Sequence, residues 1–234
     1  MILVISNIAN ETAPAWVNTF PAGAVFLVTG SDFNRSFKAA ISVNEFYSSS
    51  LTLNGTKIKL SNLDGVIVTI SGFSPVEFYY IDPEDRQYVC AEVNSFVNYF
   101  LSELKCKKLN PPGRKSFSGL SHHKIEWAKI ACNLGIPVEP FRALNGQYEY
   151  PEMNNDSTLI PCTIIGDEIM EKESDEKVHS YVRKLSKTFS LPYLRCHFST
   201  KNNRKFRLMN IDSLPDISKP EYQQAMLNYF QYTM

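Results

Sequence analysis

The sequence predicts an α/β protein with an open parallel sheet in its N-terminal half and a smaller α+β part in its C-terminal half. Two short apolar runs rich in β-branched residues, 1–6 and 24–29, flank a segment that can form a helix. This strand–helix–strand order favours parallel strands joined by right-handed crossovers. Near the other end, residues 193–199 and 205–211 are strand-like segments joined by a short polar turn, a pattern typical of an antiparallel pair.

The other elements of the N-terminal half follow from the hydrophobic pattern. Residues 12–18 can form a helix, and residues 65–70 predict a third central strand. Between residues 41 and 60 apolar and polar residues alternate on both sides of Asn54-Gly55. Asn-Gly between alternating segments is the strongest short-range hairpin signal, so we expect a two-stranded hairpin excursion from the parallel sheet.

A long helical pattern begins beyond Asp82-Pro83 and reaches about Lys105. Its apolar residues recur at three- and four-residue steps, which indicates one buried face. Asp82 before Pro83 predicts the start of the helix, because proline is tolerated in a first turn and acidic residues complement the helix dipole there. We expect the aromatic residues of this face to belong to the core.

The second half predicts fewer elements. Residues 109–143 predict a loop, a helix over 120–133, a Gly-Ile-Pro stop and a strand near Val138. A polar loop is expected over 146–157. The remaining predicted elements are a strand over 158–165, a short strand at 168–169, a helix over 175–189 and a last helix over 220–229.

Composition excludes several classes of protein. The 234 residues are 44% hydrophobic and 21% charged, with 24 basic and 24 acidic residues. A neutral chain lacks the electrostatic footprint of a nucleic-acid binder, so we expect no nucleic-acid partner. No apolar run approaches the length that crosses a bilayer, so no membrane is expected. The five scattered cysteines have no C-x-x-C spacing, which favours reduced thiols in a cytoplasmic protein.

The sequence of residues 109–137, with Leu-Asn-Pro-Pro-Gly-Arg, then a helix carrying Lys124, then Gly-Ile-Pro, resembles the linker region of ATP-grasp ligases. Its residue pattern is most similar to that of the subgroup that modifies ribosomally made peptides, the microviridin and graspetide type. The hairpin TLNGTKIKL, the strand GVIVTI and the segment from 185 to 212, which resembles the family's terminal helix and metal-binding hairpin, also follow that group's layout. The resemblance implies a pre-ATP-grasp-like α/β domain over 1–109, a linker helix and strand over 110–145, and a reduced ATP-grasp-like α+β part over 146–234.

ATP-grasp ligases activate a carboxylate as an acyl-phosphate, and lysines with magnesium neutralise the phosphate charge. The resemblance places Lys124 at the position of the first ATP lysine. We expect Lys124 and Arg114 to contact a nucleotide or another anion. The second lysine and a glycine-rich phosphate loop have no counterpart, since residues 141–163 contain no lysine and only Gly146. A phosphate cradle needs several converging backbone N–H groups, so we expect this loop to be missing.

The family also holds magnesium with an acid on one strand of a terminal hairpin and a Glu-x-Asn on the next. The resemblance aligns His197 with the acid, Asn210 with the Glu and Asp212 with the Asn. Magnesium prefers carboxylate oxygens, and this set supplies one carboxylate, so we do not expect the usual two-magnesium clamp.

Three functional hypotheses follow. The first is a shortened, degenerate ATP-grasp homologue that binds a precursor peptide or a full-length ligase in a peptide-modification pathway of natural product biosynthesis, without a cofactor. The second is a minimal active carboxylate ligase that uses ATP and Mg with Lys124 and Asp212, and a cation from Lys172, Lys177, Lys187 or a second subunit of a homo-oligomer. The third is a small-molecule binder with a cleft between its two halves, near Arg114, Lys124 and His197.

Overall fold

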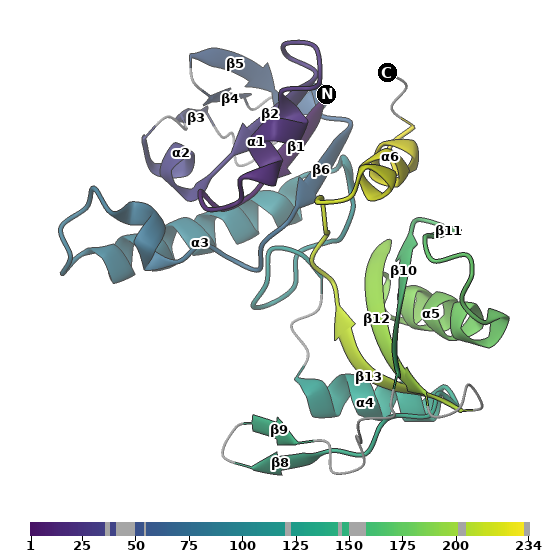
Figure 1. Ribbon diagram of the computed structural model, residues 1–234. Helices are drawn as coiled ribbons and strands as arrows, with labels where there is room; N and C mark the ends of the chain where they lie inside the picture. Colours follow the sequence, from purple (N-terminus) through teal and green to yellow (C-terminus); the bar gives the residue numbers. More distant parts are fainter. Residues whose placement is uncertain are drawn as a thin grey trace. The chain divides into compact units, whose positions relative to one another are not determined.

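The computed structural model describes residues 1–35, 38–40, 50–53, 55–119, 123–144, 147–149, 158–200 and 205–231. The chain forms two compact units, one of residues 1–121 with 214–234 and the other of residues 122–213. Figure 1 shows that the first contains a parallel sheet with helices and the second an antiparallel sheet. The division into 1–109, 110–145 and 146–234 stays a prediction, but by compactness residues 214–234 fold with the N-terminal part.

A parallel sheet of order β2-β1-β6-β7 forms the centre of the first unit, as the sequence predicts. The buried strand β1 (Ile2–Ile5) lies between β2 (Val25–Val28) and β6 (Gly65–Val68), and the short β7 (Lys107–Lys108) extends the sheet beyond β6. Helix α1 (Thr12–Val17) joins β1 to β2. Helix α2 (Gly30–Arg35) and strand β7 carry no clear hydrophobic pattern and are not predicted.

The hairpin signal at Asn54-Gly55 is confirmed. Strands β4 (Ser50–Leu53) and β5 (Thr56–Lys59) pair antiparallel, and Gly55 has the positive φ of 80° that a tight turn requires. A third strand, β3 (Lys38–Ala40), pairs with β4. Leu51 and Ile58 are directly opposite each other and turn one face of the hairpin into the core.

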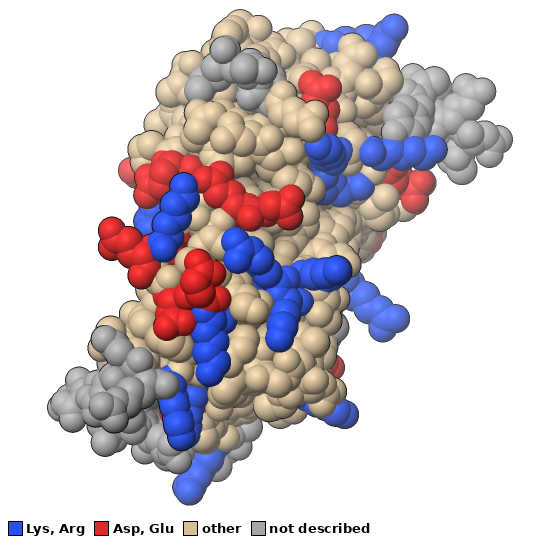
Figure 2. All heavy atoms as spheres, turned by 90° about the vertical axis from the view of Figure 1, so that its right-hand side faces the viewer, with Lys and Arg blue, Asp and Glu red and all other residues tan. Residues whose placement is uncertain are grey.

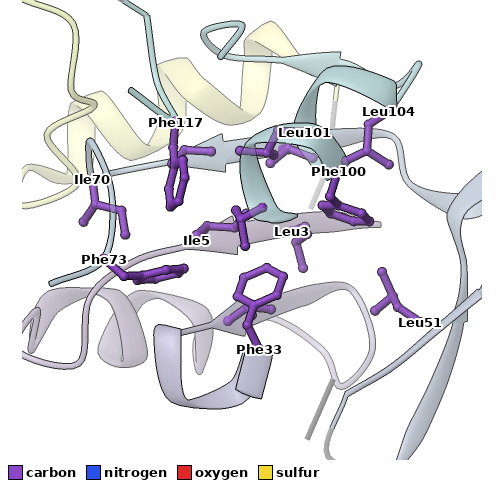
Figure 3. Close-up of a cluster of buried hydrophobic side chains, with 14 of the residues drawn as sticks. Leu3, Ile5, Phe33, Leu51, Ile70, Phe73, Phe100, Leu101, Leu104 and Phe117 are labelled. Atoms are coloured by element: carbon purple, nitrogen blue, oxygen red, sulfur yellow. The ribbon is translucent and has the colours of Figure 1, made fainter. Parts of the chain in front are cut away.

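Helix α3 (Arg86–Glu103) covers one face of the parallel sheet. Figure 3 shows its Phe100, Leu101 and Leu104 among side chains from the sheet and hairpin. The prediction of a helix start at Asp82 is wrong, because Asp82 begins a turn. Its carboxylate accepts the Glu84 N–H at 3.1 Å, and the first helical residue follows Asp85.

The last helix, α6 (Pro220–Tyr229), returns to the parallel sheet of the first unit. The Phe230 ring packs against Gly65 at the start of β6 so closely that a Cβ there would lie 2.3 Å from Phe230 Cδ1. The Tyr229 hydroxyl donates to the Lys108 carbonyl at 3.4 Å. Because Gly65 has no side chain, the end of the C-terminal helix can pack closely against the start of β6.

The second unit contains an antiparallel sheet of order β11-β10-β12-β13. Its strands are β10 (Thr158–Ile165), β11 (Glu168–Ile169), β12 (Tyr193–Thr200) and β13 (Phe206–Asp212). Helix α5 (Glu176–Phe189) begins after Asp175, whose carboxylate accepts the Lys177 N–H at 2.7 Å. Its buried stripe of Val178, Val182 and Leu185 packs on one face of the sheet and leaves the other face for polar side chains.

Helix α4 (Lys124–Asn133) precedes the small hairpin of β8 (Arg142–Leu144) and β9 (Gln147–Glu149). The predicted polar loop over 146–157 is wrong at residues 147–149, which form β9, and residues 150–157 lie outside the described part. The sequence held a signal, since Asn145-Gly146 stands between the two strands, but each has only three residues. The strand predicted near Val138 is a single parallel bridge to Leu208.

Two further findings concern membrane spans and the cysteines. No helix of the described residues is both long and apolar enough to span a bilayer. The five cysteines are all free thiols, of which Cys90, Cys162 and Cys196 are buried and Cys132 is exposed.

Candidate functional site

The candidate site begins with the pairing of β12 and β13. His197 lies directly opposite Asn210, and Arg195 lies directly opposite Asp212. Residues two apart on a strand share a face, so these four side chains project from the same side of the sheet. The structure therefore brings together the three residues predicted to hold a metal, while their metal-binding role stays a prediction.

A β-bulge produces this arrangement. The register shifts between His197 and Phe198, because Phe198 pairs with Leu208 and His197 pairs with Asn210, which leaves Met209 as an extra residue on β13. Without the bulge, Asn210 would stand opposite Cys196 on the face that α5 covers. One inserted residue thus turns Asn210 and Asp212 to the polar face.

Two charged residues that sequence reasoning did not identify also belong to this polar face. Arg195 stands between Asp212 on one side and Thr163 of β10 on the other. Glu171, from the segment after β11, accepts the Thr163 N–H at 2.5 Å and the Thr163 hydroxyl at 3.2 Å. The two-residue spacing to His197 could have revealed Arg195, whereas Glu171 carries no local signal because its place depends on tertiary folding.

The polar face carries charges of both signs around His197. Burial lowers the pKa of His197, and the positive charge of Arg195 lowers it further, while Asp212 and Glu171 act in the opposite direction. The imidazole is therefore held toward its neutral form at neutral pH. A neutral imidazole is a ligand for softer metals and not for magnesium.

The other carboxylates of this sheet region already have partners. Glu139 is buried, accepts the Ser199 hydroxyl and lies 3.8 Å from the Arg207 guanidinium. The Glu171 oxygens accept two hydrogen bonds from Thr163. Among the described residues, no group of three or more His, Cys, Asp and Glu side chains is arranged to hold a metal ion. His197, Asn210 and Asp212 do not match the oxygen-rich set that magnesium prefers.

Lys124 is the first residue of α4. Its Nζ lies 5.3 Å from the centre of the Phe141 ring and 5.8 Å from that of Trp127, so the ammonium packs over two aromatic faces. Partial burial lowers the pKa of Lys124. His123 precedes it as the N-cap, with Glu126 completing a capping box, which gives His123 a structural role.

The lysines considered as substitutes for a second ATP lysine lie on the surface of the second unit. Lys172 is 3.7 Å from Glu168, Lys177 packs over Tyr181, and Lys187 is exposed in the last turn of α5. Figure 2 shows Lys and Arg side chains beside Asp and Glu side chains on one face of the molecule. The role of these lysines in phosphate binding stays a prediction.

Arg114 belongs to the first unit, where it occupies a tight turn. Gly113 and Ser116 form an antiparallel bridge, and the Gly113 N–H donates to the Ser116 carbonyl at 2.8 Å. Arg114 and Lys115 are the two exposed residues at the tip of this turn.

The fold is that of ATP-grasp ligases. The macrocyclase MdnC from Microcystis aeruginosa MRC, solved with its precursor peptide MdnA, matches with a TM-score of 0.75 at 12% identity, over 99% of both chains. A RiPP-associated ATP-grasp ligase from Chryseobacterium gregarium, solved with ADP and a leader and core peptide, matches with a TM-score of 0.69 at 10% identity, over 97% of this chain and 95% of that one.

The ATP-grasp ligase PsnB, solved with a minimal precursor, Mg and ADP, matches with a TM-score of 0.70 at 10% identity, over 98% of both chains. No protein-family model and no curated protein matches the sequence. The structural likeness confirms the predicted resemblance to the peptide-modifying ATP-grasp ligases and the α/β fold class.

Proposed function

We propose that this chain binds a peptide partner through an ATP-grasp fold and does not run the ordinary magnesium-dependent ligase reaction. One observation carries the proposal: the polar face of β12 and β13 presents Asp212 with Arg195 directly opposite, beside His197 and Asn210. Magnesium is held by carboxylate oxygens, and a guanidinium on the same face opposes a divalent cation.

The proposal that the partner is a peptide is supported by the solved structures that share this fold. MdnC and PsnB were solved with precursor peptides, and the Chryseobacterium ligase with a leader and core peptide. A protein can keep the surface that recognises a peptide after the residues for phosphate chemistry have changed, because function resides in sites and not in the fold as a whole.

Calorimetry tests both parts. The full chain is titrated first with ATP and magnesium, and then with a set of synthetic peptides that differ in net charge. We expect no submillimolar binding of ATP and saturable binding of at least one peptide without nucleotide. Submillimolar ATP binding, together with ADP release in the presence of a peptide, would overturn the proposal.

A second candidate, the minimal carboxylate ligase, is favoured by the places of Lys124 and Asp212. Lys124 opens α4, and Asp212 projects from the polar face of the same compact unit. If this candidate holds, Lys124→Met and Asp212→Asn each abolish ADP release while the unfolding transition is unchanged. Lys129→Gln, an exposed change on α4, serves as the matched control. Under our first proposal, all three variants bind peptide as the parent chain does.

A further inference from the structure

The first unit contains a pocket of about 360 Å³ beside the carboxyl end of β6. Ser71, Gly72 and Phe73, which follow that strand, form one wall. A second wall comes from Asn94, Ser95 and Asn98 of α3, and the turn 113–117 forms the third. Ligands of open α/β sheets bind outside the carboxyl ends of the strands, and the volume falls in the range of ligand sites.

The walls of this pocket are held together by hydrogen bonds to their main chain, most of them from asparagine side chains of α3. The Asn94 amide clamps the main chain of Phe73 with bonds of 2.8 and 3.0 Å. The Asn98 amide donates to the Gly113 carbonyl at 3.2 Å, and the Phe117 N–H donates to the Ser71 carbonyl at 2.9 Å. These bonds tie α3, the strand end and the turn together, so a ligand meets a preorganised site.

The charge of the pocket has one sign. Arg114 and Lys115 are its two ionised side chains, and none of the described residues that line it is acidic. Both project from the tip of the Gly113–Ser116 turn, and Ser71 on the neighbouring wall is the residue whose carbonyl the turn contacts. A guanidinium binds a carboxylate through two parallel hydrogen bonds, and an adjacent ammonium adds a point charge.

We propose that this pocket binds the carboxylate of an acidic side chain of the peptide partner. The proposal rests on the function proposed above, since it names the chemistry by which the peptide is recognised. Arg114 and Lys115 hold the carboxylate, and the Phe73 and Phe117 rings, 5.3 Å apart, support the floor from the core (Figure 3). Peptides that carry Glu or Asp are therefore the class selected.

The test uses the ¹⁵N-labelled full chain and N-acetylglutamate N-methylamide as the probe, with the glutamine analogue as its neutral counterpart. We expect the glutamate probe to shift the amide signals of residues 71–73, 94–98 and 113–117, and the glutamine analogue to leave them in place. Arg114→Gln with Lys115→Gln weakens binding about tenfold or more. Arg183→Gln with Lys184→Gln, which removes the same two charges from exposed positions on α5, leaves binding unchanged.

Three results would each overturn the assignment: equal binding of the glutamine analogue, unchanged binding in the Arg114/Lys115 double variant, or tighter binding of inorganic phosphate at the same amides. The first two exclude a charged recognition site, and the third indicates a phosphate site instead. A peptide that binds the double variant with full affinity contradicts the pocket assignment and leaves peptide binding intact. ADP release contradicts the proposed function and leaves the probe result standing.

Discussion

The Asn94 side chain makes hydrogen bonds with both main-chain polar groups of Phe73. Its Oδ1 accepts the Phe73 N–H at 2.8 Å, and its Nδ2 donates to the Phe73 carbonyl at 3.0 Å. The Phe73 residue is buried and both hydrogen bonds are partly buried, so their loss leaves polar main-chain groups with few other partners. The pair links the segment after β6 to α3 and so fixes one corner of the first unit.

Asn94→Ala is expected to lower the free energy of unfolding by about 1–3 kcal/mol, because it leaves the buried Phe73 N–H without its acceptor. Denaturant unfolding followed by circular dichroism measures this. Ser95→Ala, an exposed change one residue further along α3, should cost less than about 0.5 kcal/mol. Equal losses of unfolding free energy in the two variants would show that the Asn94 hydrogen bonds contribute no more to stability than an exposed serine does.

The contact of Phe230 with Gly65 predicts a coupled pair. Gly65→Ala places a methyl group in the Phe230 ring, and overpacking of this kind costs about 1–3 kcal/mol. Phe230→Leu removes the clash, so the double variant should lose less stability than the two single variants together. Gly72→Ala is the control, since its Cβ would meet only Asn94 at an ordinary 3.5 Å. Strict additivity of the Gly65 and Phe230 changes would contradict the contact.

Much of the fold could be predicted because burial and local pattern agree. The run Thr158–Ile165 and the helix Pro220–Tyr229 have the predicted bounds, since each combines a clear period with strong end signals. The start of α3 could not, because Asp82 is equally suited to a turn and to a cap. The three-residue strands β8 and β9 are too short for a pattern to stand out.

The candidate site was predictable only in part. The two-residue spacing of Asn210 and Asp212 puts them on one face, but their place opposite His197 depends on the Met209 bulge, which no sequence pattern announces. Arg114 was expected to contact a nucleotide or another anion. Its pocket, with Asn94 and Asn98 from a distant helix, exists only through tertiary packing.

The thiols should differ sharply in reactivity. Cys162 and Cys196 are buried and directly opposite on neighbouring strands, and burial raises the pKa of Cys162 to about 11 and that of Cys196 well above its usual value. Thiolates are the reactive species, so these two should resist Ellman's reagent until the chain unfolds. Exposed Cys132 should react at once, and Cys132→Ser should abolish this fast phase. A fast phase that survives when both Cys132 and the half-buried Cys106 are changed to Ser would contradict the burial of Cys90, Cys162 and Cys196.

Glu77 makes stability depend on pH. Its side chain is buried and accepts the N–H groups of Gly30 and Ser74 at 3.4 Å each. Burial raises the pKa of Glu77, and those backbone hydrogen bonds only partly oppose the rise. The folded chain therefore retains a proton at pH values where the unfolded carboxyl has lost it.

Stability should consequently fall as the pH rises from about 4.3, the value of an unfolded glutamate, through the raised pKa of folded Glu77. Glu77→Gln cannot titrate, so its unfolding free energy should change less over this window, although the amide loses one acceptor and lowers stability overall. Unfolding curves at a series of pH values measure the slope. The exposed Glu84→Gln should retain the parent slope, because the Glu84 carboxylate is in water. If Glu77→Gln and the parent chain lose stability in parallel, the buried carboxyl is not the group responsible.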